Sequence, residues 1–195
     1  MQSAFWAPRN ADYKEFFSAV LAGDVATLAS KTFCADFNFD ALRYINYLKD
    51  DDDDDDDDDG TDNGEGTAAL HIAAASGHVE MVKFLLAKGA DVNVQDVSID
   101  SIYTPLLVAA SKSNTEIVEV LLDHGADITQ RGDHFQGTAL HLVLWRVREV
   151  EQKSIDTIKL LLDRGMDVNV TDGEYGYTVV SSLVRLRCWI AIYEK

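Results

Sequence analysis

The 195-residue chain has few of the features that mark secreted or membrane proteins. Its two cysteines, Cys34 and Cys188, have the spacing of neither a disulfide framework nor a zinc site, which favours a reducing compartment. No apolar run approaches the ~18 residues that cross a bilayer. The first residues, MQSAFWAPRN, lack the basic region and long apolar stretch of a secretory signal. We therefore expect a cytoplasmic or nuclear protein.

Positive charge is also scarce. The sequence has 17 Lys and Arg residues against 34 Asp and Glu residues, which gives a formal net charge of -17. Ten of the negative charges lie at 50–59, and -17 without those ten is still -7. Because an acidic surface repels phosphate groups, we predict that the protein binds neither nucleic acid nor an anionic membrane.

Common catalytic and metal-binding motifs are missing as well. The five histidines are scattered, and no HExxH, GxSxG, phosphate-binding loop or CxxC pattern is present. Neither cysteine has a candidate general base next to it in the sequence. We therefore predict a protein that is not an enzyme, with no catalytic residues, no metal site and no cofactor.

What the sequence does contain is repetition. The segment TAALHIAAASGHVEMVKFLLAKGADVN, which begins at Thr67, is echoed by YTPLLVAASKSNTEIVEVLLDHGADIT and again by a segment at 138–172. A glycine follows each Leu-Leu pair, at Gly89, Gly125 and Gly165, with spacings of 36 and 40 residues. A period near 33 residues with a turn, two helices and a T-P-L-H-x-A motif resembles the ankyrin repeat.

This resemblance covers nearly the whole chain and implies an all-α fold. We expect an α-solenoid of helix-turn-helix repeats with finger loops, made of about four repeats and a terminal half-repeat. The expected divisions are a lead-in at 1–11, a degenerate capping repeat at 12–40, an insertion at 41–65, repeats at 66–99, 100–133 and 134–172, and a partial repeat at 173–195.

Short motifs predict where several helices begin and end. Thr104 followed by Pro105 fits a cap and the first residue of a helix. Ser113 with Glu116 has the spacing of a capping box at the next helix. The three glycines after the Leu-Leu pairs fit the left-handed residue that ends a helix.

The fourth repeat departs from the pattern of the others. Thr138 and His141 keep both members of a threonine–histidine pair that, in the family it resembles, is hydrogen-bonded at the helix start. About six extra residues lie between the two helices of this repeat. We therefore predict a lengthened first helix, with Ser154 as the cap of the second helix.

The insertion at 41–65 contains ten consecutive aspartates. It opens with ALRYINYLK at 41–49, which is long enough for about two helical turns, and residues 50–66 hold twelve carboxylates without Lys or Arg. Such a segment repels itself and has nothing apolar to bury, so the composition predicts disorder.

A calcium-binding interpretation of this tract fits less well. Asp55, Asp57, Asp59 and Gly60 match positions 1, 3, 5 and 6 of an EF-hand loop, but position 12 holds Gly66 instead of glutamate. A run of aspartates before a glycine generates such a match automatically. We favour a neutral insertion over diffuse attraction of cations or basic partners, and both over a specific calcium site.

Without catalytic motifs, function is expected to come from the surface. The resemblance implies that a protein partner binds the concave wall made by the fingers and the exposed side of the first helices. The variable motif positions on that wall are Thr67, Ala75, Ser76, Tyr103, Ser111, Lys112, Phe135, Gly137, Trp145 and Arg146. An alternative for these positions is that some of the side chains only pack against adjacent repeats. The alternatives are a cation-responsive protein that acts through 50–65, and a piece of a larger adaptor or enzyme.

Two further expectations concern single sites. Ankyrin proteins with a leucine eight residues before the asparagine of a DVN motif are substrates of an asparagine hydroxylase, so the resemblance makes Asn93 and Asn169 candidate acceptors. Apolar residues wrap much of the expected helix at 183–193, where terminal repeats usually have a polar outer face. We expect this helix to mediate self-association or partner binding.

Overall fold

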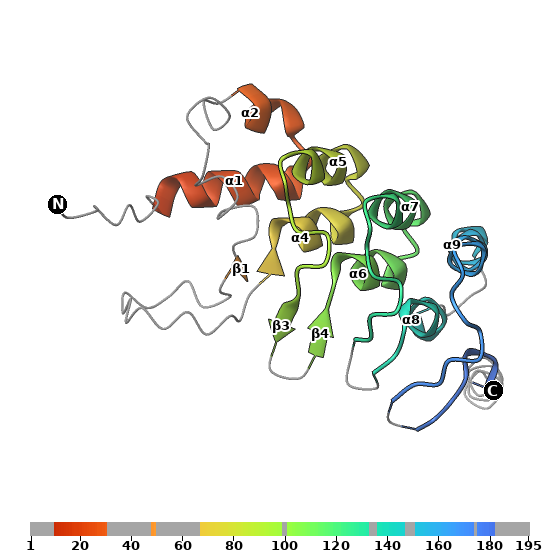
Figure 1. The fold of residues 1–195 in the computed structure, drawn as a ribbon. Coiled ribbons are helices and arrows are strands. Elements are labelled where there is room, and N and C mark those ends of the chain that lie inside the picture. The colour runs from red at the N-terminus through yellow and green to blue at the C-terminus, as the bar shows by residue number, and fades with distance from the viewer. Residues whose placement is uncertain are drawn as a thin grey trace, which may run out of the picture.

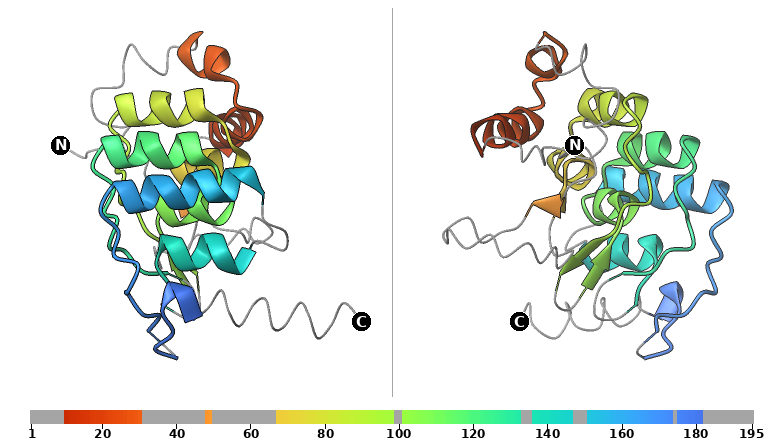
Figure 2. Two further views of the ribbon diagram at one scale, coloured as in Figure 1. Left: turned by 90° about the vertical axis from the view of Figure 1, so that its right-hand side faces the viewer. Right: turned by 60° about the vertical axis from the view of Figure 1, so that its left-hand side comes forward.

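The structure is a computed structural model that describes residues 10–30, 48–49, 67–98, 101–132, 136–146, 151–173 and 175–181. These residues form a stack of helical hairpins (Figure 1). Each hairpin places a first helix in one layer and a second helix in the other, and successive hairpins lie side by side (Figure 2).

Helices therefore make up two layers. The first helices are α1 (Asn10–Ala22), α4 (Ala69–Ser76), α6 (Pro105–Ser111) and α8 (Ala139–Arg146). The second helices are α2 (Val25–Ser30), α5 (Val79–Ala87), α7 (Thr115–Asp123) and α9 (Gln152–Asp163). The prediction of an all-α solenoid of helical hairpins is confirmed.

The first helices pack closely because small residues lie where they meet. Ala73 and Ala74 of α4 and Ala109 and Ala110 of α6 are fully buried. Larger side chains from the second helices complete the core, and the equivalent fully buried leucines are Leu85, Leu121 and Leu161. The core is therefore continuous along the stack, as burial of apolar surface between neighbouring repeats requires.

Two of the predicted helix-end signals, the Thr104-Pro105 start and the three glycines, are confirmed. Thr104 caps α6, because its hydroxyl oxygen accepts a hydrogen bond from the backbone N–H of Leu107 at 3.4 Å, and Pro105 is the first helical residue. The second helices α5, α7 and α9 are each followed by a glycine in the left-handed region, with φ angles of 92° at Gly89, 87° at Gly125 and 90° at Gly165.

The predicted capping roles of Ser113 and Ser154 are wrong. Helix α7 begins at Thr115 after Asn114, and Ser113 lies outside the helix with a positive φ of 53°. Helix α9 begins after Glu151, which places Ser154 inside its first turn, where it is buried. The two serine hydroxyls hydrogen-bond to each other at 3.1 Å, because the two hairpins pack side by side.

In the fourth repeat the second helix is the longer element. Helix α9 has 12 residues, whereas α5 and α7 have 9 each. Helix α8 has 8 residues, the same number as α4, and residues 147–150 after it lie outside the described ranges. The described part of the chain therefore shows the extra length in α9.

Two short antiparallel strand pairs join successive hairpins. They pair β1 (Leu48–Lys49) with β2 (Thr67–Ala68) and β3 (Asp96–Ser98) with β4 (Ser101–Tyr103). The pair β3–β4 projects as a finger beyond the first-helix layer (Figure 1).

The acidic insertion is attached to the first of these strand pairs. Leu48 and Lys49 are extended, so the helix predicted over 41–49 is wrong for its last two residues. Residues 41–47 and the acidic tract at 50–66 lie outside the described residues. The pairing of β1 with β2 nevertheless fixes both ends of the tract in the row of finger loops.

Candidate protein-binding surface

The candidate binding positions form two series along the stack. The finger series lies just before the first helices: Thr67 in β2, Tyr103 in β4 and Gly137 before α8. The helix-end series lies at the carboxyl ends of the first helices: Ala75 and Ser76 in α4, Ser111 and Lys112 at the end of α6, and Trp145 and Arg146 in α8. The fold thus repeats the same two positions in three consecutive hairpins.

Members of the two series differ in exposure. Ala75, Ser76 and Lys112 are exposed, Tyr103 and Trp145 are half-buried, and Ser111 and Gly137 are buried. The Ser111 hydroxyl donates to the backbone carbonyl oxygen of Val108 at 2.8 Å. For Thr67 and Arg146 only the backbone is described, and Phe135 lies outside the described residues. The described series therefore offers small side chains, one lysine and two aromatic rings to a partner.

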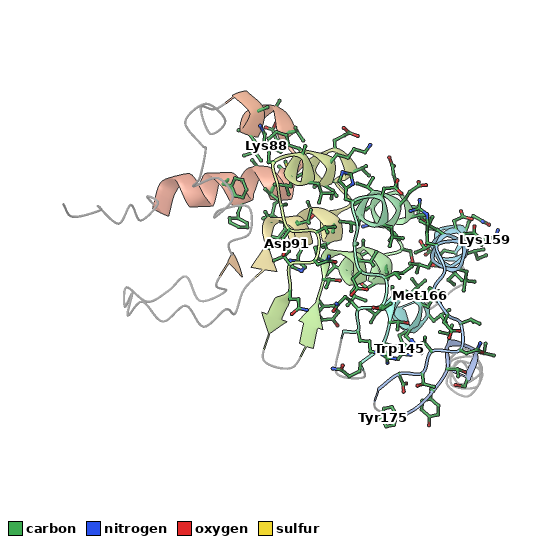
Figure 3. The ribbon with its side chains drawn as sticks, in the orientation of Figure 1. Lys88, Asp91, Trp145, Lys159, Met166 and Tyr175 are labelled. Carbon is green, nitrogen blue, oxygen red and sulfur yellow. The ribbon has the colours of Figure 1, made fainter. Side chains whose placement is uncertain are left out.

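Trp145 lies close against the backbone that leads into its own helix (Figure 3). A β-carbon on Gly137 would lie 2.7 Å from two ring carbons of Trp145, closer than side-chain atoms approach one another. The ring centroid of His141 is 5.5 Å from that of Trp145, with the planes tilted by 48°. Glycine at 137 therefore leaves space for the indole. In this repeat a residue of the helix-end series, Trp145, thus contacts a residue of the finger series, Gly137.

The His141 ring that packs against Trp145 is held in place by hydrogen bonds on both of its nitrogens. Its Nδ1 accepts hydrogen bonds from the Thr138 hydroxyl at 2.9 Å and from the Thr138 backbone N–H at 3.3 Å. Its Nε2 then carries the proton and donates to the carbonyl oxygen of Tyr177 at 3.1 Å. Burial lowers the pKa of His141, which keeps the ring neutral for this role. The predicted Thr138–His141 pair is confirmed.

The equivalent histidine of the second repeat makes the same link to its neighbour. Nε2 of the buried His71 lies 3.0 Å from the carbonyl oxygen of Tyr103. The third repeat has Leu107 at this position, and a leucine side chain has no hydrogen-bonding group. The position of Tyr103 in the finger series is therefore fixed by the preceding repeat.

The aspartates of the repeated finger turn have a structural role. Each accepts a hydrogen bond from the backbone N–H two residues further on, the pattern of an Asx turn. The donors are Asn93 to Asp91 at 2.9 Å, Thr129 to Asp127 at 2.9 Å and Asn169 to Asp167 at 2.8 Å. Hydrogen bonds from Thr129, its hydroxyl first, lower the pKa of Asp127.

Several contacts between repeats had no signal in the sequence beyond the repetition itself. The Asn114 side-chain amide donates to the carbonyl oxygen of Ala74 at 2.8 Å. Nε2 of His78 lies 2.9 Å from the carbonyl oxygen of Leu21. Both residues immediately precede a second helix and reach back to the first helix of the preceding hairpin. Such pairs lie 40 and 57 residues apart in the chain, so local patterns cannot reveal them.

Within the described ranges, no group of three or more His, Cys, Asp or Glu side chains is placed to hold a metal ion. No helix in those ranges is both long and apolar enough to cross a membrane.

Stacked helical hairpins with left-handed glycines and a threonine–histidine link define a solenoid repeat protein. Two family models, described as ankyrin repeats in many copies and ankyrin repeats in 3 copies, match residues 70–122 and 97–172. The ankyrin repeat protein FPV031 of fowlpox virus (strain NVSL) is 32% identical over 126 residues. That similarity covers 65% of this chain and 35% of the viral protein. The chain belongs to the ankyrin-repeat family.

Proposed function

We propose that the chain is a non-enzymatic interaction module that binds a protein partner in the cytoplasm or nucleus. Ankyrin repeats generally act as protein-interaction modules, and the chain belongs to that family. On this proposal the partner lies along the finger series and the helix-end series. The observation that best supports this surface is the exposure of Ser76 and Lys112 at equivalent ends of neighbouring first helices.

The chemistry of the two series suits a polypeptide partner. Tyr103 and Trp145 each present part of an aromatic ring while the rest is packed against the core. Because Tyr and Trp bury a large area with few rotatable bonds, they are enriched among the residues that dominate binding energy at interfaces. The proposed partner therefore places apolar side chains over these rings.

The charge of the chain favours a partner with a basic surface. The net charge is -17, and the ten aspartates at 50–59 are attached to β1 and β2 in the row of fingers. Long-range attraction of this kind raises association rates and weakens as salt screens it. Replacing 50–59 with a Gly/Ser linker is expected to leave the fold intact. Slower association at low salt would show that the tract attracts the partner, and unchanged association would show that it is the neutral insertion favoured from the sequence.

A second candidate function for the same tract is weak binding of divalent cations, which its charge supports. Calorimetry with calcium on the intact chain distinguishes the two ideas. Saturable one-site binding in the micromolar range would favour a specific cation site.

A matched pair of charge reversals tests the proposed surface. Lys112→Glu changes the helix-end series, and Lys153→Glu makes the same change at an exposed position of α9 outside both series. Proteins captured from a lysate are identified by mass spectrometry, and the binding of a purified partner is then measured. We expect about a tenfold loss for Lys112→Glu and none for Lys153→Glu. Equal binding by both variants and the parent would refute the surface.

Two narrower proposals concern the extent of the chain and its self-association. As an alternative, the array is part of a larger adaptor or enzyme, an interpretation suggested by the 35% of the viral relative that the similarity covers. Self-association through 183–193 concerns residues outside the described ranges. Light scattering on the parent and on Trp189→Glu/Ile190→Ser tests it, and a parent that stays monomeric at high concentration would refute it.

The two candidate hydroxylation sites differ in accessibility. The side-chain oxygen of Asn93 accepts from the backbone N–H of Asp127 at 2.8 Å, and its amide donates to the carbonyl oxygen of Gly125 at 3.4 Å. Asn169 is exposed. We propose that Asn169 is modified before Asn93 on incubation with the hydroxylase. Peptide mass spectrometry without a +16 shift on either peptide would remove the idea.

A further inference from the structure

The second helices form a row in which each helix covers one side of the helix before it. Figure 2 shows α5, α7 and α9 lying side by side. Ion pairs cross both contacts: Lys83 Nζ of α5 lies 3.9 Å from Glu116 Oε1 of α7, and Arg164 Nη1 after α9 lies 2.7 Å from Asp123 Oδ1 of α7. Arg164 also lies 3.4 Å from Glu119 of α7.

We call the side of a second helix that faces the next second helix in chain order its forward side, and these ion pairs identify it. Counting back from the helix-ending glycines, Lys83, Glu119 and Lys159 occupy equivalent positions. Lys83 pairs with the next helix, and so does Glu119. Lys159 therefore lies on the forward side of α9, and Figure 3 shows it on the side of α9 away from α7.

Apolar residues at equivalent positions on the forward side are covered in α5 and α7 and exposed in α9. Leu86 of α5 and Leu122 of α7 are half-buried and pack against the core, whereas the equivalent Leu162 of α9 is 39% exposed. Ile155 occupies the position of Thr115, whose hydroxyl contacts that of Thr157 in α9 at 2.7 Å. Among the described residues, no further helix covers this side of α9.

We call Ile155, Lys159, Leu162 and Asp163 the open α9 face. These residues lie at i, i+4, i+7 and i+8, so they form one stripe of a helix. The stripe has two apolar side chains, one positive charge near its middle and one negative charge at its end. Among the described residues, no ion pair of Lys159 with a carboxylate is present.

The existing contacts specify what fits this face. At the α5–α7 contact the forward lysine faces an acidic residue in the first turn of the next helix, Glu116. At the α7–α9 contact the forward aspartate faces a basic residue just after the next helix, Arg164. Counted from their own glycines, these two partner positions are eight residues apart.

We propose that the open α9 face binds an amphipathic helix of a partner protein. That helix runs parallel to α9, with a carboxylate in its first turn opposite Lys159 and a Lys or Arg eight residues later opposite Asp163. Apolar side chains between them cover Ile155 and Leu162. A charge order of acid first and base last also matches the helix dipole of the partner. This surface is separate from the finger and helix-end series, so either proposal can fail without the other.

Helix α9 itself supplies a probe with the required pattern. Asp156 and Arg164 stand eight residues apart, at the positions equivalent to Glu116 and one residue before the helix-ending glycine. Because short helices are marginal in water, the probe is a lactam-bridged, fluorescein-labelled peptide of residues 151–166. Its binding to the full chain is measured by fluorescence anisotropy.

The expected result is saturable binding that depends on both kinds of contact. Leu162→Glu in the full chain weakens binding at least tenfold, and Lys159→Glu weakens it about fivefold, the range of an exposed ion pair. A peptide with Asp156→Lys binds the Lys159→Glu chain better than it binds the parent. Lys88→Glu, the same charge change at an exposed position after α5, leaves binding unchanged.

Several results would overturn the proposal. They are no saturable binding up to millimolar chain, binding that Leu162→Glu does not affect, and a charge swap that fails to restore affinity. Self-association of the parent that Leu162→Glu abolishes would assign the face to a second copy and also overturn it. Thermal unfolding of each variant checks that the fold is intact, and Leu162→Ser, a neutral change, replaces Leu162→Glu if that variant unfolds.

Discussion

Two neighbouring junctions of the stack are built differently although the hairpins they join are alike. At the junction of the second and third repeats, one ion pair, Lys83 with Glu116 at 3.9 Å, joins two side chains, and the hydrogen bonds run from side chains to backbone groups. The contacts are His71 to the Tyr103 carbonyl at 3.0 Å, Asn93 to the Asp127 N–H at 2.8 Å and Asn114 to the Ala74 carbonyl at 2.8 Å.

At the junction of the third and fourth repeats, Thr115 and Arg131 donate to the backbone carbonyl oxygens of Lys153 at 3.3 Å and Thr171 at 2.7 Å. Most of the contacts there, however, join two side chains. The pairs are Ser113 with Ser154 at 3.1 Å, Thr115 with Thr157 at 2.7 Å and Arg164 with Asp123 at 2.7 Å. The third repeat has Leu107 where the second has His71, and Thr129 where it has Asn93. The lost motif contacts are thus offset by residues outside the motif.

The difference has a consequence for substitutions. A backbone carbonyl or N–H is present whatever residue a neighbouring repeat holds, so each of these hydrogen bonds of the first junction depends on one side chain. The Ser113–Ser154, Thr115–Thr157 and Arg164–Asp123 contacts of the second junction depend on two side chains each. Pairwise coupling between mutations is therefore expected for these pairs, and at the first junction for the ion pair of Lys83 with Glu116 but not for the hydrogen bonds to the backbone.

Substitutions in the apolar core are expected to cause the largest losses of stability, and losses of similar size at both junctions. Leu121 and Leu161 are fully buried at equivalent positions. Replacing either with alanine is expected to lower the free energy of unfolding by about 3 kcal/mol, since a cavity is left in a packed interior. Chemical denaturation measures both values. A difference of more than about 2 kcal/mol between them would show that the core itself distinguishes the junctions.

Asn114→Ala tests the first junction. It removes the amide donor and leaves the carbonyl oxygen of Ala74 without that contact. We expect a loss of about 1–2 kcal/mol in the free energy of unfolding. Asn114→Asp serves as the control, because it keeps the size but not the donor; retention of full stability by Asn114→Asp would contradict the role of this bond.

Thr115→Val and Thr157→Val test the second junction as a double-mutant cycle. Each single variant leaves one hydroxyl facing a methyl group and is expected to lose about 1 kcal/mol. The double variant is expected to lose less than the sum, because neither hydroxyl is left facing an apolar neighbour. Additive losses within error would mean that the 2.7 Å contact contributes no coupling.

The stability that His141 provides is expected to depend on pH. Burial lowers the pKa of His141 below its ordinary value of 6.5, so the unfolded chain binds more protons there than the folded chain. The stability that this neutral ring provides is complete above about pH 6.5 and is lost as the pH falls toward the folded pKa. His141→Leu, which copies Leu107, is expected to show a smaller drop in melting temperature between pH 7.5 and 5.5. An unchanged drop would assign the pH effect to other groups.

The smallest effect is expected from Arg164→Ala. Its ion pairs with Asp123 and Glu119 lie at a largely exposed site, where such pairs contribute about 0.2–1 kcal/mol. Denaturation at low and high salt measures the contribution, which should shrink as salt screens it. A loss that does not depend on salt would point to packing of the arginine stem instead.

The sequence predicted the features that depend on local backbone preferences. Thr104-Pro105, the glycines after the Leu-Leu pairs and the Thr138–His141 pair all act within a few residues, so their spacing is enough to place them. Ser113 and Ser154 were misread as caps, because each hydroxyl binds a partner 41 residues away. The extended Leu48–Lys49 was missed for the same reason, since its pairing partner lies across the acidic tract.

The candidate surface was predictable only as a set of positions. Repetition placed Ser76 and Lys112 at the ends of first helices, where they are exposed. It could not show that Ser111 bonds its own helix or that Trp145 fills the space above Gly137. Those facts depend on how side chains pack in three dimensions, and they separate the exposed positions from the buried ones.

Hydrogen exchange on the chain with and without its captured partner tests the central claim most directly. If the finger and helix-end series bind the partner, backbone amides at 74–77, 103–104 and 110–113 will exchange more slowly in the complex, while those of α5 and α7 will change little. Protection confined to α5, α7 or α9, with no change at the ends of α4 and α6, would contradict binding through the finger and first-helix surface.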